Sequence, residues 1–244
     1  MEHNPLEQFE IHRHGVPIHI FGIDASVTNS SLVMLGIIVL TTLFLTLGMR
    51  QKALVPGRWQ SMAELSYEFV ANMLNETVGP GAKRYFPFVF TLFMFILTAN
   101  LLGMVPYGFT VTSHIIVTFA LAAVVFVLVT IVGFLRNGAG FLKLFVPSGM
   151  PVALLPFLVM IELLSYLFRP ISLSVRLFAN MMAGHTLMKV FGGFVFALGW
   201  WAGWAPLGFL IALTGLELGI AILQAYVFAI LTCIYLNDAF HPGH

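Results

Sequence analysis

Long apolar runs alternate with short polar or basic connections along most of this chain. The runs at residues 31–49, 86–105 and 113–135 each approach the ~20 residues that a helix needs to cross a bilayer. The last two runs share residues 148–238, and each is too long for one perpendicular crossing of a hydrocarbon core about 30 Å thick. The pattern predicts an all-α polytopic membrane protein with five membrane-crossing helices, the last two forming a long, strongly tilted antiparallel hairpin.

The segment at about residues 58–78 has a different pattern. Its apolar residues, from Trp59 to Met73, recur at helical spacing, and acidic and amide side chains occupy the other faces. Such an amphipathic helix is too polar to span the hydrocarbon core. We expect it to lie along the membrane surface; packing on a soluble partner is the alternative.

Residues 1–29 form a polar arm, and we expect a single transmembrane helical domain over residues 30–244. Four histidines fall in the arm, namely His3, His12, His14 and His19. These side chains could bind a metal or belong to a solvated tail. Their spacing fits no tight ligand set, which favours the solvated tail.

The turn of the predicted hairpin has two candidate positions. Gly192–Gly193 could interrupt the helix, but the stretch Gly199–Pro206 carries the stronger turn signals. Pro156 and Pro170 would allow bends in the first of the two long helices.

Composition supports a membrane location. Apolar residues make up 59% of the chain and charged residues only 9%, and the mean hydropathy is +0.97. Soluble domains carry roughly 25% charged residues, so this surface is not built for water. The net charge of +1 gives no indication of nucleic-acid binding, and the single Cys233 excludes an internal disulfide.

Basic residues are concentrated in two of the connections. They are Arg50, Lys52, Arg58, Lys83, Arg84, Arg136 and Lys143. The connections at about 106–112 and 195–206 contain no Lys or Arg. Because basic loops remain on the cytoplasmic side of a membrane, we expect the N-terminus outside and the C-terminus in the cytoplasm or its equivalent.

Arg176 lies deep within an apolar stretch and is the polar residue hardest to explain by structure alone. An arginine at bilayer depth costs about 2.5–3.5 kcal/mol on insertion scales, so a functional role is the default hypothesis. Asn180 follows one helical turn later and shares its face. His185 points about 180° away from Arg176 on an ideal helix.

An antiparallel hairpin with its turn near residue 200 places residues whose numbers sum to about 400 at similar depth. The polar residues of the two long helices then fall at three depths. From the outer to the inner side, the pairs are His185 with Glu217, Arg176 with Gln224, and Glu162 with Asp238.

These three depths suggest two aqueous half-pathways separated by a cationic barrier. His185 and Glu217 could relay protons on the outer side and Glu162 on the inner side, because such groups can titrate near neutral pH. An arginine does not release its proton, so Arg176 would block direct passage and attract a carboxylate. No acid of this chain lies at its depth, which indicates a partner carboxylate on another subunit.

Structural interpretations of the same residues stay open. Glu162 could form an ion pair with Arg169, and His185 could be a satisfied polar residue between helices. Gln224 could form a hydrogen bond between helices, and the same is expected of Asn100 and His114. These alternatives leave Arg176 as the residue with the strongest functional indication.

The run SLSVRLFANMMAGH, residues 172–185, resembles the signature of subunit a (subunit 6) of F-type ATP synthases. The segment LQAYVFAILTCIYLNDAFH resembles the last helix of that family, and NPLEQFEI and NDAFHPGH extend the resemblance over essentially the whole chain. The arrangement of His185 and Glu217 is similar to that of mitochondrial and alphaproteobacterial members.

The resemblance implies a proton-channel stator subunit of the membrane (Fo) sector, without catalysis or a nucleotide site of its own. The family's essential arginine falls on Arg176, which would face the ion-carrying carboxylate of each c subunit as the c ring turns. The channel residues of the family fall on Glu162, Asn180, His185, Glu217 and Gln224.

The resemblance also implies partners and a location. The partners are the ring of c subunits, the peripheral-stalk b subunits and the rest of the ATP synthase, within a lipid bilayer. The membrane would be the bacterial inner (plasma) membrane or the mitochondrial inner membrane. We expect no metal or cofactor, and the chain contains no phosphate-binding Gly-rich loop.

Three other functions fit less well. A secondary transporter working alone would need its own carboxylate at the depth of Arg176 and usually shows inverted repeats. A haem-carrying subunit could use His114 and His185, but paired histidines on facing helices are not evident. A membrane protease would need a Ser–His or zinc-type spacing within a span, and the sequence contains none.

Overall fold

The computed structural model describes residues 19–20, 23–24, 28–50, 56–105, 108–146 and 154–241. Its elements in chain order are β1 (His19–Ile20), β2 (Ile23–Asp24), α1 (Asn29–Gly48), α2 (Arg58–Thr77), η2 (Pro80–Tyr85), α3 (Phe86–Gly103), η3 (Val111–Ser113), α4 (Ile115–Asn137), η4 (Gly138–Phe145), α5 (Leu155–Ala202) and α6 (Trp204–Phe240). Three of the four arm histidines (His3, His12, His14) and the basic Lys52 lie outside the described residues.

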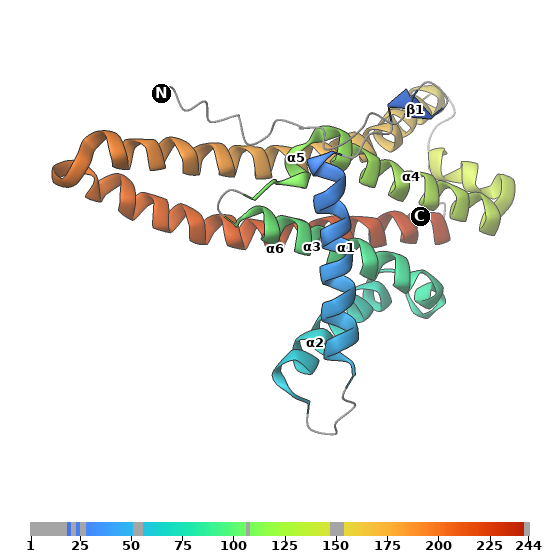
Figure 1. Ribbon diagram of the computed structural model, residues 1–244. Helices are drawn as coiled ribbons and strands as arrows, with labels where there is room; N and C mark the ends of the chain where they lie inside the picture. The colour runs from blue at the N-terminus through green and yellow to red at the C-terminus, as the bar shows by residue number, and fades with distance from the viewer. Residues whose placement is uncertain are drawn as a thin grey trace. The chain divides into compact units, whose positions relative to one another are not determined.

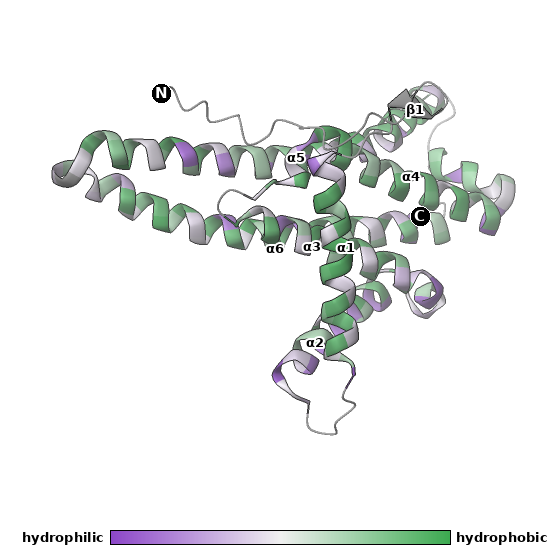
Figure 2. Ribbon diagram, in the orientation of Figure 1, coloured by the Kyte–Doolittle hydropathy of each residue, from purple (hydrophilic) through white to green (hydrophobic). Residues whose placement is uncertain are grey.

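Five helical segments of the described chain are long and apolar enough to cross a membrane, as predicted. They are Asn29–Gly48, Pro80–Gly103, Ile115–Phe145, Leu155–Gly199 and Trp204–Phe240. Figure 2 shows that apolar residues predominate along these helices. Helix α2 coincides with the predicted amphipathic segment and is not among the five. Its place at a membrane surface stays a prediction.

The described chain divides into two compact units. The first unit consists of Met1–Ala63, Met94–His114 and Leu177–Ala225, and the second of Glu64–Phe93, Ile115–Arg176 and Tyr226–His244. Helices α2, α3, α5 and α6, which are labelled in Figure 1, each contribute residues to both units.

In the first unit, side-chain hydrogen bonds cap the N-terminus of α1 and join neighbouring helices to one another. Thr28 and Ser31 form a capping box, in which the Ser31 backbone N–H donates to Thr28 Oγ1 at 3.3 Å. Thr41 donates to Thr98 of α3 at 3.1 Å. Asn100 Nδ2 donates to the Ala221 carbonyl of α6 at 3.1 Å, which confirms the helix-to-helix role expected of Asn100.

The hairpin turn also belongs to the first unit. Gly199 has φ 60° and ψ −159°, which ends the regular helix, whereas Gly192 and Gly193 lie within α5. The second of the two candidate turn positions is therefore confirmed. A residue with a Cβ rarely adopts this backbone conformation, so glycine is required here.

Contacts across the hairpin confirm its antiparallel register. The rings of Phe191 and Phe209 lie 4.4 Å apart between centroids. The Thr214 hydroxyl donates to the Met188 sulfur at 3.8 Å. Both pairs of residue numbers sum to about 400, as the pairing rule requires. Within the described part of α5 the backbone stays helical at Pro170, and Gly199 is the one interruption.

In the second unit, aromatic and polar contacts join α4, η4, α5 and α6. The Tyr166 and Thr130 hydroxyl oxygens lie 2.6 Å apart. Asn137 Nδ2 donates to the Ala239 carbonyl at 2.6 Å, which ties the end of α4 to the end of α6. A Cβ on Gly133 would approach the Phe141 ring to 2.4 Å, so the close approach of η4 to α4 requires glycine.

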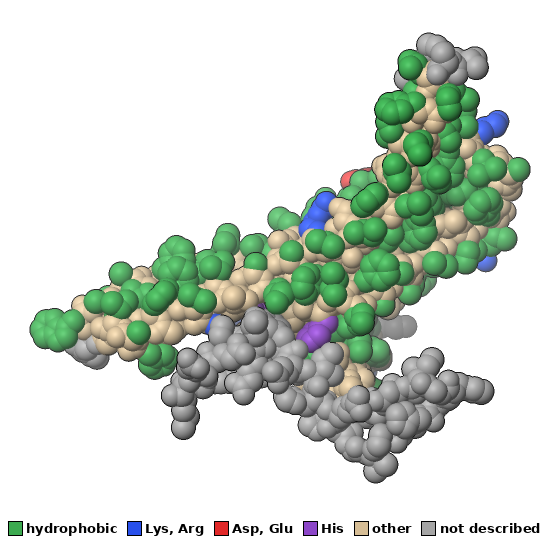
Figure 3. Space-filling view, turned by 90° about the horizontal axis from the view of Figure 1, so that it is seen from above, with side chains coloured by type: hydrophobic (Ala, Val, Ile, Leu, Met, Phe, Trp, Pro, Cys, Tyr) green, Lys and Arg blue, Asp and Glu red, His purple; other side chains and the backbone are tan. Residues whose placement is uncertain are grey.

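Many apolar side chains on the helix surfaces are exposed in the isolated chain. Leu135 is 82% exposed, Ile116 78% and Phe196 88%. Figure 3 shows apolar side chains covering much of the face in view. Such surfaces are unfavourable in water and suit contact with lipid or with other apolar helices.

Candidate functional site

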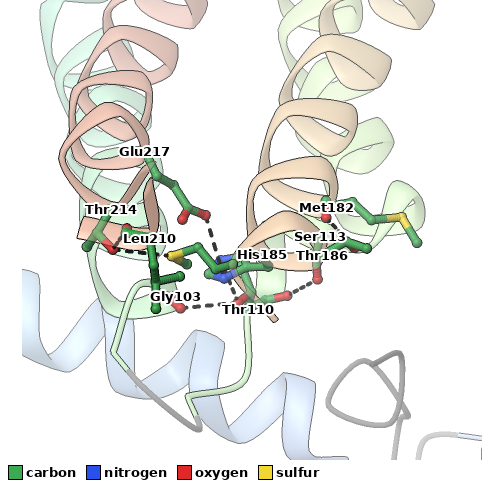
Figure 4. A network of polar contacts seen from close by, with 10 residues as sticks. Gly103, Thr110, Ser113, Met182, His185, Thr186, Leu210, Thr214 and Glu217 are labelled. Atoms are coloured by element: carbon green, nitrogen blue, oxygen red, sulfur yellow. Dashed lines mark hydrogen bonds and ion pairs between the residues drawn. The ribbon is translucent and has the colours of Figure 1, made fainter. Parts of the chain in front are cut away.

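A buried acid–imidazole pair lies within the hairpin part of the first unit (Figure 4). His185 of α5 and Glu217 of α6 face each other, with 3.6 Å between Nδ1 and Oε1. Their side chains are only 7% and 4% exposed. The register predicted from the sequence is therefore correct for this pair, and the structure brings the two candidate residues together.

The other imidazole nitrogen of His185 contacts the connection before α4. Its Nε2 lies 3.2 Å from Thr110 Oγ1. The Thr110 hydroxyl also lies 3.4 Å from the Gly103 carbonyl, to which it can donate. Ser113 donates to the Thr110 carbonyl at 2.6 Å and holds this connection in place. With Thr110 accepting from Nε2–H, the neutral imidazole presents an unprotonated Nδ1 toward Glu217.

Glu217 has an unusual environment. Both carboxylate oxygens are buried, and neither accepts a hydrogen bond from a described residue. Gly184 makes room for this carboxyl group, because a Cβ at Gly184 would lie 2.7 Å from Oε1. Buried polar groups nearly always have hydrogen-bond partners, so a buried carboxyl group without one is unusual.

Two further candidates, Asn180 and Gln224, belong to the first unit. Gln224 is 6% exposed, and Asn180 is half-buried. Neither side chain forms a hydrogen bond with the described part of the chain. The helix-to-helix hydrogen bond considered for Gln224 is therefore not present among the described residues.

Arg176 and Glu162 belong to the second unit. Arg176 is exposed on α5, as are its neighbours Ser172 and Val175. Its guanidinium forms no ion pair or hydrogen bond with a described residue. This long apolar helix thus carries a charged side chain that is exposed in the described part of the chain.

The end of the hairpin away from the turn contains a different ion pair from the one considered. Arg169 Nη1 lies 2.8 Å from Asp238 Oδ2, so Asp238 is bound by Arg169. The considered pairing of Glu162 with Arg169 is absent from the described residues. Glu162 is half-buried and keeps its carboxylate unpaired within them.

Sequence reasoning did not find Thr110, Ser113 or Gly184 as parts of the site. Thr110 is distant in sequence from His185, and nothing in a single sequence indicates which loop residue reaches an imidazole. Gly184 adjoins His185 in the run AGH, which is the one local signal that could have drawn attention to it. His114, expected to form a hydrogen bond between helices, places its Nδ1 3.3 Å from the carbonyl of Thr110, four residues earlier in the same connection.

A buried acid–imidazole pair and an unpaired arginine within membrane-spanning helices define a membrane protein with an ion pathway. Comparison with known proteins gives the particular family. A sequence profile described as ATP synthase A chain matches residues 30–237. The chain therefore belongs to the ATP synthase A chain family.

Individual relatives support the assignment over the full length. The chain is 59% identical over 244 residues to ATP synthase subunit a of Pelagibacter ubique, covering 100% of both chains. It is 58% identical to ATP synthase subunit a of Parvibaculum lavamentivorans, over 99% of this chain and 95% of the relative. The same protein of Paramagnetospirillum magneticum is 58% identical, with 98% of each chain covered.

Proposed function

We propose that this chain conducts protons as the stator subunit of the membrane sector of an ATP synthase, with two offset half-pathways separated by Arg176. The observation that carries the proposal is the buried His185–Glu217 pair, whose carboxyl group has no other hydrogen-bond partner among the described residues. A buried pair of groups that can each gain and lose a proton is typical of proton relays in membranes. Family membership supports the same function.

On the outer side, the imidazole is held so that a proton can pass along it. Thr110 binds Nε2, which leaves Nδ1 facing Glu217. A proton arriving at the imidazole converts it to imidazolium, and Nδ1–H can then be transferred toward the carboxylate. The 3.6 Å separation exceeds a direct hydrogen bond, so transfer requires a small approach of the side chains or one bridging water.

In the centre, Arg176 acts as the barrier. Its charge is permanent and it is exposed on α5 without a partner in the described chain. We propose that it faces the ring of c subunits and attracts the ionised carboxylate of each c subunit in turn. A protonated carboxyl group is neutral and can move into lipid, whereas the ionised form cannot. A c subunit can therefore pass through the lipid only while its carboxyl group is protonated.

On the inner side, Glu162 receives the proton that the c-subunit carboxyl group releases. It is half-buried and unpaired among the described residues, as a relay group facing a wet passage would be. Asn180 and Gln224 complete the polar lining as hydrogen-bonding side chains.

The relatives named above are bacterial, which supports the inner membrane of a bacterium as the location. The peripheral-stalk b subunits are the other expected membrane partners.

Replacing the carboxyl group of Glu217 tests the proposal. Glu217→Gln keeps the side-chain shape but cannot release a proton, so ATP-driven proton pumping into inverted vesicles should fall about 100-fold, a loss typical of removing a proton-transfer group. ATP hydrolysis by the attached head shows that the complex has assembled. Thr214→Val, on the same helix and exposed, is the matched control and should pump normally. Pumping by Glu217→Gln at the rate of the control would contradict the proposal.

A further inference from the structure

A groove of about 810 Å³ lies along α4 in the second unit. Most of the side chains that line it are apolar, and the lining at the C-terminal end of α4 is basic. The lining residues are Arg84, Tyr85, Ala123, Val124, Val127, Leu128, Ile131, Val132, Leu135 and Arg136. No acidic residue of the described segments lines it, and the proposed proton pathway does not use it.

The basic end contains two guanidinium groups without an ion-pair partner among the described residues. Arg84 comes from η2 and Arg136 from the last turn of α4, and both are exposed. Arg136 is held in position by stacking, because its guanidinium carbon lies 3.8 Å from the centre of the Phe240 ring. The Tyr85 ring also packs against the Phe240 ring, with 5.8 Å between the ring centroids. Arg136 and Tyr85, the neighbour of Arg84 in sequence, thus both contact Phe240, and both arginines line the groove.

The apolar part of the groove belongs to a segment that crosses the membrane. Ile115–Phe145 is one of the five candidate spans and Pro80–Gly103 is another. Along α4, Val124 is 55% exposed and Val127 is 52% exposed. An acyl chain in the groove would cover these side chains, and the two arginines would then lie where a phospholipid carries its phosphate.

We propose that this groove is a binding site for an anionic phospholipid, with the phosphate bound by Arg84 and Arg136 and an acyl chain lying along α4. Charge complementarity favours this occupant, because guanidinium groups bind phosphate through paired, charge-assisted hydrogen bonds. Basic pockets at the cytoplasmic ends of membrane helices bind anionic headgroups in the same way. The proposal rests on the membrane location of α4 and does not depend on the proton pathway.

Photolabelling of the whole ATP synthase in lipid nanodiscs tests this site. One probe is phosphatidylglycerol with a diazirine in its acyl chain, and the other is phosphatidylcholine with the same acyl chain. Peptide mass spectrometry should find phosphatidylglycerol on α4 between Val124 and Leu135, with far less phosphatidylcholine there. At about fivefold per arginine, Arg84→Gln with Arg136→Gln should lower the anionic labelling about 25-fold.

Lys83→Gln is the matched control, because Lys83 adjoins Arg84 in η2 and does not line the groove. It should leave the labelling unchanged, and Arg84→Lys with Arg136→Lys should retain most of it. Equal labelling of the wild-type complex by the two lipids would overturn the proposal, and this comparison needs no variant. A photoreactive side chain at Val127 that captures a protein subunit in place of lipid would overturn it as well.

Discussion

At the scale of single residues, the Thr110 hydroxyl is the contact that orients the His185 imidazole. It lies 3.2 Å from Nε2 and comes from a connection held by Ser113. A hydrogen bond at one ring nitrogen decides which nitrogen of the neutral imidazole carries the proton. With Thr110 accepting from Nε2–H, the Nδ1 that faces Glu217 is unprotonated in the neutral imidazole.

Replacing this hydroxyl should slow proton transfer. Thr110→Val keeps the side-chain shape and removes the hydrogen bond, which at a net value of about 0.5–1.5 kcal/mol corresponds to a roughly two- to thirteenfold loss of ATP-driven pumping. Pumping per unit of ATP hydrolysis in inverted vesicles measures this loss.

Thr112→Val is the control for that substitution. Thr112 lies in the same connection and is fully buried, and its Oγ1 makes no hydrogen bond with a described residue. It should pump at the wild-type rate. Equal losses in the two variants would mean that Thr110 supports the fold of the connection and has no part in proton transfer.

The sequence predicted part of this site for a clear physical reason. Two antiparallel helices have a fixed rise per residue, so the position of the turn determines that His185 meets Glu217. Thr110 reaches the same imidazole from an irregular connection, for which no periodicity exists. Asp238 shows a second limit, because the long side chain of Arg169 reaches it from a different depth of the hairpin.

At the scale of elements, the hairpin of α5 and α6 depends on one backbone conformation. Gly199 has φ 60° and ψ −159°, a combination that side chains with a Cβ disfavour by about 1–3 kcal/mol. Clashes with neighbouring residues do not explain the need for glycine here, since a Cβ at Gly199 would meet nothing within 4 Å.

Gly199→Ala should therefore destabilise the hairpin through the backbone alone. We expect a loss of about 1–3 kcal/mol, observed as a lower melting temperature of the detergent-solubilised complex. Gly192→Ala is the control, since Gly192 is helical and has equally open surroundings. It should leave the melting temperature unchanged or raise it, because alanine favours helix over glycine. A larger fall in melting temperature for Gly192→Ala than for Gly199→Ala would contradict the assignment of the turn to Gly199.

Helix positions were predictable from hydropathy, and the short 3₁₀ segments were not. The first crossing was predicted at residues 31–49 and the helix is Asn29–Gly48. Apolar runs of this length have few alternatives to a helix in a membrane. The 3₁₀ segments Pro80–Tyr85 and Gly138–Phe145 depend on local contacts such as that of Gly133 with Phe141, which leave no pattern in the sequence.

At the scale of the whole molecule, the basic connections predict its orientation in the membrane. Single cysteines in a Cys233→Ser background can test this with a membrane-impermeant maleimide. Ala139→Cys in η4 should react only in inverted vesicles, and Trp201→Cys at the hairpin turn only in right-side-out ones. Trp201 is 92% exposed, so its replacement should be tolerated. The reverse labelling pattern would place the proposed outer half-pathway on the wrong side.

The partners of this protein are the property that is hardest to predict from a single sequence. Exposed apolar helices show that something covers them, but apolar surface alone does not distinguish lipid from protein. Arg176 is more informative, because an unpaired charge in an apolar helix requires a counter-charge of a particular kind. The family assignment makes the chain a member of an ATP synthase, and we propose that this complex supplies the counter-charge.

Proton flux in vesicles that carry the whole complex with Arg176→Ala is the most direct test of the central claim. Ser172→Ala, one helical turn earlier on the same exposed face, is the control. We expect Arg176→Ala to abolish ATP-driven pumping while the ATPase head stays attached, and passive proton conductance to persist or rise once the head is removed. Ser172→Ala should pump normally. Coupled pumping by Arg176→Ala at near wild-type rates would show that the arginine is structural and that no cationic barrier separates two half-pathways.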